Sequence, residues 1–171
     1  MKCPRLCSLV LLAFMTLSAF AADSMQLKAA IVYNILLFVE WPREAITGPS
    51  IVLCIDQTAP ARSALRSLAG SPVRQYRLEL QELAAGEPPV HCQALFVDSS
   101  APPLPLTVRN QLKGLPVLVI AEERAAGDDV TAIRLVESEG RMAFEVGLPT
   151  IRRARLQLSS HLLRLARRVS E

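Results

Sequence analysis

Residue types common in catalysis occur together at one place in the chain, where two serines precede a histidine at Ser159-Ser160-His161. A serine activated by a histidine is the nucleophile of many hydrolases. Adjacent residues of a helix point about 100° apart, however, and a catalytic triad is assembled in space rather than along the sequence. We therefore interpret the serines as small residues that pack a helix against a sheet. An unrecognised hydrolase is kept as an alternative.

Metal and cofactor chemistry finds little support in the sequence. The two histidines, His91 and His161, stand far apart, whereas metal sites usually combine closely spaced His, Cys or carboxylate side chains. His91 precedes Cys92, and Asp128-Asp129 could bind a cation, but adjacent acids in a loop are usually only solvated. The glycine-rich phosphate-binding loops and the nucleophile elbow of hydrolases have no match. The sequence predicts no metal site, no cofactor and no catalytic residue.

The chain begins with the features of a secretory signal peptide. Two basic residues precede an apolar run at residues 6–20, and Ala19-Phe20-Ala21 forms a small-x-small cleavage site. A membrane-spanning helix needs about 20 apolar residues, so a retained anchor is the less favoured alternative. A lipid-modified cysteine is discounted, because Cys7 lies before the apolar centre of this run. We predict a cleaved signal peptide at residues 1–21 and a single domain at residues 22–171.

Cleavage leaves two cysteines, Cys54 and Cys92, in an oxidising compartment. A disulfide between them would close a loop of 38 residues, worth about 4 kcal/mol in the chain-entropy model. The alternative is two separate buried thiols, because free cysteine is often buried. We favour the disulfide.

The charge is unevenly distributed. From Thr150 onward the chain carries six arginines and one acid, whereas residues 22–149 carry 11 basic and 15 acidic groups. A near-neutral exported body argues against nucleic acid as a partner. The basic face of the C-terminal segment is either solvated or meets an acidic partner or anionic lipid headgroups.

Short apolar runs alternate with helical patterns along the chain. Predicted strands cover residues 51–55, 76–81, 94–97 and 116–121, and a hairpin covers 133–137 and 142–148. Predicted helices cover residues 28–41, 61–68, 101–112 and 149–169. This alternation predicts an α/β fold with a mostly parallel, doubly wound sheet, helices on both faces, a C-terminal antiparallel hairpin and a long terminal helix.

The opening helix has too few polar residues for an ordinary surface helix. In "KAAIVYNILLFVEWP", residues 28–42, the polar residues Lys28, Asn34 and Glu40 are six residues apart and point in three directions about 120° apart. Either the rest of the domain buries this helix, or another chain covers it. Trp41, the single tryptophan, either caps the core or anchors an interface.

Three acids lie at or just after predicted strand ends, where doubly wound sheets bind ligands. Asp56, Asp98 and Glu122 are therefore candidate ligand-binding residues. The alternative is that they are ordinary turn residues.

Six stretches, in this order and spacing over residues 28–169, resemble the YfiR family of periplasmic proteins. They are "KAAIVYNILLFVEWP", "IVLCI", "CQALFV", "PVLVIAEE", "IRLVESEGRMAFEVGL" and "LQLSSHLLRLARRV". The chain departs from the family pattern at Gly127-Asp128-Asp129, where two glycines are common, at Gly147 in place of Asn, and at Gln93 in place of His. These departures leave the fold unaffected, but the family's ligand specificity is not carried over.

The resemblance implies regulation rather than catalysis. Family members resemble a periplasmic protein that inhibits an inner-membrane diguanylate cyclase. An OmpA-like outer-membrane lipoprotein sequesters that inhibitor. Some relatives serve histidine kinases instead. The resemblance implies a structural or redox-sensing disulfide between Cys54 and Cys92. The candidate partner-binding residues are Tyr33, Leu37, Phe38, Glu40 and Trp41. Homodimerisation is left open, and a periplasmic small-molecule binding module serving a sensor kinase is the alternative function.

Overall fold

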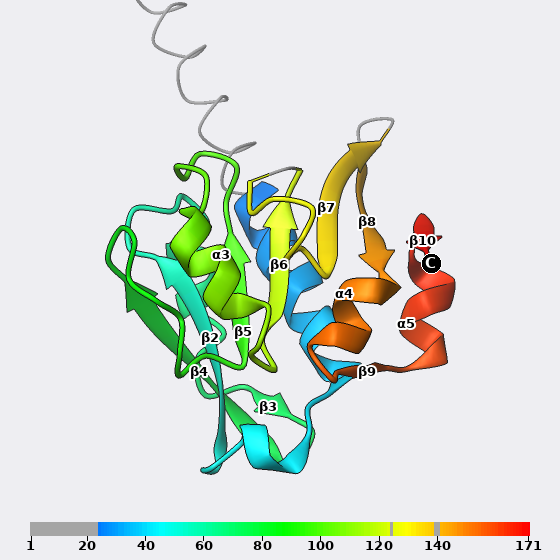
Figure 1. Ribbon diagram of the computed structural model, residues 1–171, viewed down its shortest axis with the longest axis horizontal. Helices are drawn as coiled ribbons and strands as arrows, with labels where there is room; N and C mark the ends of the chain where they lie inside the picture. Colours follow the sequence, from blue (N-terminus) through cyan, green and yellow to red (C-terminus); the bar gives the residue numbers. More distant parts are fainter. Residues whose placement is uncertain (1–23, 124, 139–140) are drawn as a thin grey trace, which may run out of the picture.

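The centre of the molecule is an eight-stranded sheet (Figure 1). A computed structural model describes residues 24–123, 125–138 and 141–171, so the predicted signal peptide lies outside the described residues. The strands of this sheet are β2 (Ser50–Asp56), β3 (Pro72–Val73), β4 (Tyr76–Leu83), β5 (Ala94–Val97), β6 (Leu118–Glu122), β7 (Ile133–Ser138), β8 (Arg141–Gly147) and β10 (Arg168–Ser170). Their order across the sheet is β10-β8-β7-β6-β5-β2-β4-β3.

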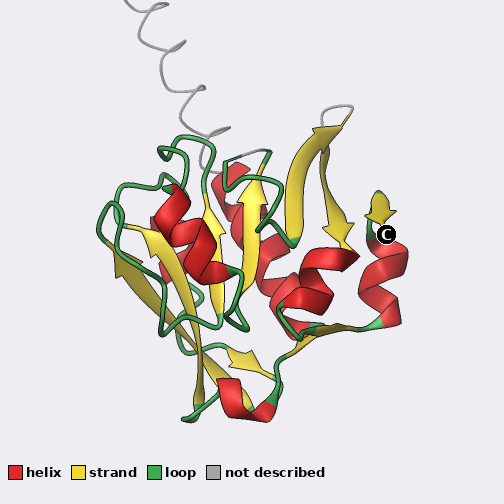
Figure 2. Ribbon diagram, viewed as in Figure 1, coloured by secondary structure: helices red, strands yellow, loops and turns green. Residues whose placement is uncertain are grey.

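Short helices connect and cover these strands (Figure 2). The first helix covers residues 24–37. The shorter ones are η1 (Arg43–Ala45), α2 (Arg62–Arg66), α3 (Leu106–Leu112), α4 (Leu148–Arg153) and α5 (Ser160–Leu165). A second, two-stranded sheet pairs β1 (Val39–Glu40) with β9 (Gln157–Leu158).

The α/β class is confirmed, but the prediction of a mostly parallel sheet is wrong because the sheet is mixed. Strands β4, β2, β5, β6 and β7 pair in parallel. The predicted hairpin then turns β8 antiparallel to β7. Two elements that the sequence did not predict add to the reversal: β3 forms a tight antiparallel hairpin with β4, and β10 joins β8 at the opposite edge. Both edges of the sheet therefore run against its centre.

The sheet is covered on both faces, as predicted. The first helix lies behind the sheet and α3 lies in front of it (Figure 1). On the face that we call the first-helix face, the buried residues of the first helix and α2 share one cluster with the strands: the helix residues are Ala29, Val32, Ile35, Leu36, Ala64 and Leu65. On the α3 face, Val108 and Leu112 share a second cluster with Cys54 and Cys92. The wholly apolar sequence of β5 fits burial on both faces.

The predicted long terminal helix over residues 149–169 is wrong. After α4, Arg155 has a positive φ of 57°, and the N–H of Leu156 donates to the carbonyl of Ile151 at 3.1 Å. This six-to-one hydrogen bond ends a helix as a Schellman motif. The side chain of Ser159 then accepts from two N–H groups and caps the start of α5. The apolar stripe of this segment is therefore divided among α4, β9, α5 and β10.

The first helix begins and ends earlier than the predicted residues 28–41. It ends at residue 37, before a turn at Phe38 and the short strand β1. Its inward positions are fully buried, whereas Leu27, Ala30 and Asn34 are exposed. Within the described residues, no helix has the length and apolar character needed to cross a membrane.

Candidate interaction site around the first helix and the disulfide

The structure joins Cys54 and Cys92 in a disulfide, as predicted. Cys54 lies on β2 and Cys92 lies two residues before β5, with 5.8 Å between their Cα atoms, a usual separation for a disulfide. Both cysteines are buried in the core of the α3 face. The bridge therefore links β2 to the segment that leads into the neighbouring strand β5, and its redox role remains a prediction.

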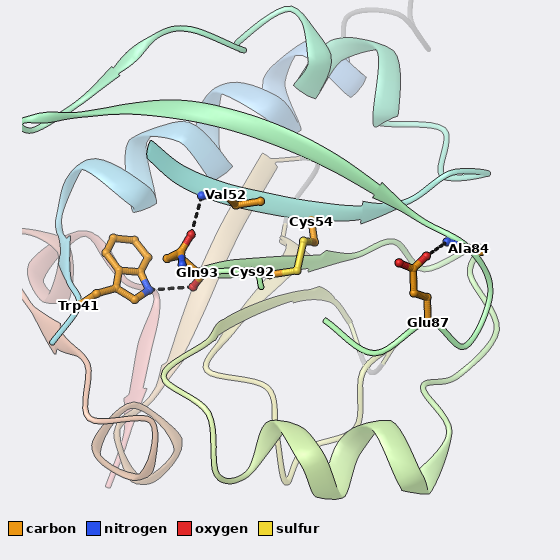
Figure 3. Close-up of a disulfide and its surroundings, with 7 residues drawn as sticks. All are labelled: Trp41, Val52, Cys54, Ala84, Glu87, Cys92 and Gln93. Carbon is orange, nitrogen blue, oxygen red and sulfur yellow. Dashed lines mark hydrogen bonds between the residues drawn. A yellow bond between two sulfur atoms is a disulfide. The ribbon is translucent and has the colours of Figure 1, made fainter. Parts of the chain in front are cut away.

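Gln93 connects the disulfide segment to the chain that follows the first helix. Its side-chain oxygen accepts from the N–H of Val52 at 2.8 Å, and its side-chain nitrogen donates to the carbonyl of Ala45 at 2.9 Å. Its backbone carbonyl accepts from the indole N–H of Trp41 at 2.7 Å. Figure 3 shows Gln93 between Trp41 and the disulfide. The position where the family pattern has His is thus occupied by a residue that holds three segments together.

Four of the five candidate partner-binding residues make contacts within the chain. The hydroxyl of Tyr33 donates to the carbonyl of Pro72 at 2.7 Å. The ring of Phe38 lies 5.1 Å from the ring of His161, centroid to centroid. Glu40 pairs with Arg74 at 2.8 Å. Trp41 bonds to Gln93 and, like Tyr33 and Phe38, is half-buried against the core.

Leu37 is different from these four residues. It is half-buried, but it is not among the apolar residues that pack on the cluster of the first-helix face. Leu27, Ala30, Asn34 and Leu37 are spaced by three or four residues, so they form one stripe of the helix. Leu27 is 50% exposed. The exposed Gln26, four residues before Ala30, lies on the same side of the helix. The outward stripe of the first helix therefore carries two polar side chains, those of Gln26 and Asn34, and neither is charged.

The three candidate ligand-binding acids lie at the ends of three adjacent strands, but in different environments. Asp56 is half-buried at the end of β2, and its carboxylate accepts from the N–H of Thr58 at 2.7 Å. Asp98 and Glu122 are only 3% and 5% exposed. One Glu122 oxygen accepts from the N–H and hydroxyl of Ser99 at 3.2 and 2.8 Å. These two acids are part of the folded core rather than of an open site.

Lys28 neutralises the buried carboxylate of Glu122. Its ammonium lies 2.7 Å from the second oxygen of Glu122, and both side chains are largely buried. Sequence reasoning missed this pair and the role of Gln93. For Lys28, an available signal was a lone charge on a helix that is otherwise almost wholly apolar, because a buried charge needs a partner.

The residues that suggested other chemistry have structural contacts. Ser159 caps α5 through its hydroxyl, and His161 lies against Phe38. His91 is exposed beside the disulfide. Within residues 24–123, 125–138 and 141–171, no group of three His, Cys, Asp or Glu side chains could hold a metal ion.

The two adjacent acids of the loop before β7 are held by basic side chains. Asp128 pairs with Arg134. Asp129 pairs with Lys113 at 2.8 Å and with Arg109, both from the segment of α3. The hydrogen bond from Lys113, followed by the contacts with Arg109, lowers the pKa of Asp129 below its usual 3.8 although partial burial opposes this. These ion pairs attach the loop to α3.

Together these features define a class: a mixed α/β protein with a disulfide on one face of its sheet and a largely apolar helix on the other. The model of the YfiR/HmsC-like family matches residues 25–167. The chain therefore belongs to the YfiR/HmsC-like family, as the sequence motifs indicated. No curated protein matches the chain.

Proposed function

We propose that this protein is a periplasmic regulator that binds and inhibits the periplasmic domain of an inner-membrane diguanylate cyclase. Membership of the YfiR/HmsC-like family supports this proposal. In it, the N-terminal segment is a cleaved signal peptide, and an OmpA-like outer-membrane lipoprotein sequesters the regulator. Envelope or redox state would then control cyclic di-GMP synthesis. A histidine kinase is the alternative membrane partner.

The observation that carries the proposal is the outward stripe of the first helix. A surface helix normally presents many polar residues to water, but this stripe presents Leu27, Ala30 and Leu37 beside the two amides Gln26 and Asn34. Apolar side chains interspersed with uncharged polar ones fit the centre of a protein interface, where charged residues are depleted. The contacts of Tyr33, Phe38 and Trp41 within the chain fix the helix and its end, so they orient this stripe rather than form it.

Inhibition requires a difference in affinity between two states of the partner. A regulator that bound the active and inactive conformers equally would shift nothing. To change the inactive population from 1% to 99%, it must bind the inactive conformer about 10⁴-fold more tightly. The protein needs no catalytic residue for this role.

Cellular cyclic di-GMP tests the proposal. Deletion of the gene should raise the cyclic di-GMP level, and expression of the wild-type chain should lower it again. The Leu27→Glu/Leu37→Glu variant should fail to lower it, because two carboxylates would be buried without partners in the interface. An unchanged level after deletion would count against the cyclase as target.

The matched control is Leu106→Glu, which places the same charge on α3 at a side chain that is 68% exposed. This variant should repress as well as the wild type. If it fails equally, general charge rather than the first helix determines binding. Urea unfolding of all variants establishes that each is folded at the assay temperature.

A small-molecule binding module serving a sensor kinase is the second candidate. A cavity of about 320 Å³ at the carboxyl ends of β2, β4 and β5 favours it. Of the three acids suggested by the sequence, Asp56 is the one that lines this cavity.

A further inference from the structure

The cavity lies where the chain leaves two neighbouring strands toward opposite faces. After β2 the chain runs to α2, whose buried residues belong to the first-helix face. After β5 it runs to α3 on the other face. In α/β sheets such a reversal opens a crevice at the carboxyl ends of the strands, and ligands bind there. The cavity is lined by Asp56, the last residue of β2, and by residues within and after β4 and β5.

The wall of the cavity is largely apolar and poor in hydrogen-bond donors. Leu95, Val97 and Val108 form part of it and belong to the core of the α3 face. Four prolines also line it: Pro89, Pro102, Pro103 and Pro105. Because proline has no N–H, these positions offer a ligand carbonyl oxygens and apolar ring surface. None of the described lining side chains is a hydrogen-bond donor when Asp56 and Glu87 are ionised, so a ligand that supplies donors complements this wall.

The ionisable side chains among the described lining residues are both acidic, Asp56 and Glu87. Each carboxylate is fixed by the backbone through one oxygen. Asp56 accepts from the N–H of Thr58. Glu87 accepts from the N–H of Ala84 at 2.9 Å, and Figure 3 shows this second bond. The latter bond closes a turn in which Gly86 has a φ of 79°, a conformation that favours glycine.

The second oxygen of each carboxylate makes no hydrogen bond or ion pair with the residues that the structure describes. Two fixed acceptors of the same charge beside an apolar cavity favour a cation. They disfavour phosphates and carboxylates, because no lysine, arginine or histidine is among the described lining residues. Nucleotides are disfavoured for the same reason.

We propose that this cavity binds a small molecule with an apolar body and a protonated amine, whose ammonium group faces Asp56 and Glu87. A volume of about 320 Å³ is near the lower end of ligand pockets and suits a single aromatic ring with a short amine chain. The proposal gives the second candidate function a ligand class and depends on that function only for its physiological role.

Three probes that share a phenyl ring test the charge preference: phenethylamine, 2-phenylethanol and phenylacetate. Each is titrated into the isolated protein while backbone amide shifts are followed by NMR. Phenethylamine should shift the amides of the loops after β4 and β5 and bind about tenfold more tightly than the alcohol, because its hydrogen bonds are charge-assisted. Phenylacetate should produce no saturable shift.

Two variants locate the effect. Asp56→Asn/Glu87→Gln should weaken phenethylamine binding about tenfold and leave 2-phenylethanol unchanged, because only the charge is removed. Val108→Phe should weaken both, because it fills part of the cavity. The matched control is Glu137→Gln, which removes an exposed carboxylate from β7 and should change neither.

Three results would overturn the proposal: no saturable shift with phenethylamine, equal binding of phenethylamine and phenylacetate, or an unchanged amine preference in Asp56→Asn/Glu87→Gln. The first two need no variant, so misfolding cannot produce them. The assay contains no partner protein. Its failure would therefore leave the inhibition of a cyclase standing, and loss of the cyclase effect would leave amine binding standing.

Discussion

The two faces of the sheet are closed in different ways. On the first-helix face, a helix of residues 24–37 presents a run of buried apolar side chains to the strands. On the α3 face, a seven-residue helix, proline-containing loops and the disulfide between Cys54 and Cys92 share the covering. The first face is closed by continuous packing, and the second by a short helix together with a covalent link.

This difference accounts for where the cavity is found. A short helix and loops with fixed backbone angles cannot follow the surface of a sheet as closely as a long helix can. They leave space at the carboxyl ends of the strands, which is lined by Val108 of α3 and the prolines. The disulfide stabilises this less densely covered face without filling it.

The largest effect should come from the packed face. Leu36→Ala should lower the free energy of unfolding by about 4 kcal/mol, because Leu36 is fully buried in the first helix. Leu112→Ala on α3 should cost about 2 kcal/mol, since its surroundings can relax more easily. Urea denaturation measures both.

The exposed Leu106→Ala is the control for these two variants and should change the unfolding free energy by no more than about 0.5 kcal/mol. Equal costs for Leu36→Ala and Leu112→Ala would show that the two faces are packed alike. The comparison between the faces would then fail.

The disulfide should have the next largest effect. Cys54→Ala/Cys92→Ala should lower the free energy of unfolding by about 3 kcal/mol, because the open chain gains entropy when unfolded. The measurement is urea denaturation with and without reductant. Reductant should destabilise the wild type by a similar amount and have no effect on the double variant. An unchanged wild type would mean that the covalent link contributes nothing to the α3 face.

The third largest effect on stability should come from the buried ion pair of Lys28 with Glu122. Lys28→Met should cost about 3 kcal/mol by leaving the Glu122 carboxylate buried without its cation. Lys28→Met/Glu122→Gln should recover part of this loss. Lys113→Met, which breaks the more exposed pair with Asp129, should cost less than about 1 kcal/mol. Thermal and urea unfolding of the three variants measures these costs. Equal costs for Lys28→Met and Lys113→Met would show that the buried pair is no more important than the exposed one.

The smallest effect is electrostatic and belongs to the α3 face. Lys113 and Arg109 lower the pKa of Asp129 below 3.8 in the folded state. The stabilisation is therefore fully present above the unfolded-state pKa and is lost as the pH falls through the lowered folded-state pKa. Asp129→Asn should lower stability slightly at pH 7 and not at pH 2. A difference that persists unchanged at pH 2 would assign the effect to packing instead.

The sequence was sufficient for the elements whose local pattern is unambiguous. The apolar runs at residues 51–55 and 94–97 became central strands, and the alternation after residue 141 became β8 of the hairpin. The prediction of one long terminal helix was wrong because the apolar spacing continues across Arg155. Arg155 ends α4 in the left-handed conformation, where a glycine is usual. Ser159, read as a packing residue, is the cap that marks the real start of α5.

The candidate site was predicted less completely. The pairing of Cys54 with Cys92 followed from the cysteine count. Trp41 became a candidate residue because it is the single tryptophan. The role of Gln93 and the ion pair of Lys28 with Glu122 depend on neighbours 41 or more residues away. A local sequence pattern does not indicate neighbours that are so distant along the chain. The cavity likewise exists only once the end of β2 meets the loops after β4 and β5.

The hydrogen bond from Trp41 to Gln93 gives the molecule an intrinsic optical reporter. Trp41 is the single tryptophan of the chain, and its indole N–H bonds to the residue that follows a disulfide cysteine. Indole emission depends on hydration and on hydrogen bonding of this N–H. Fluorescence at the junction of the first helix and the sheet can therefore be followed without a label, and it originates beside the covalent link.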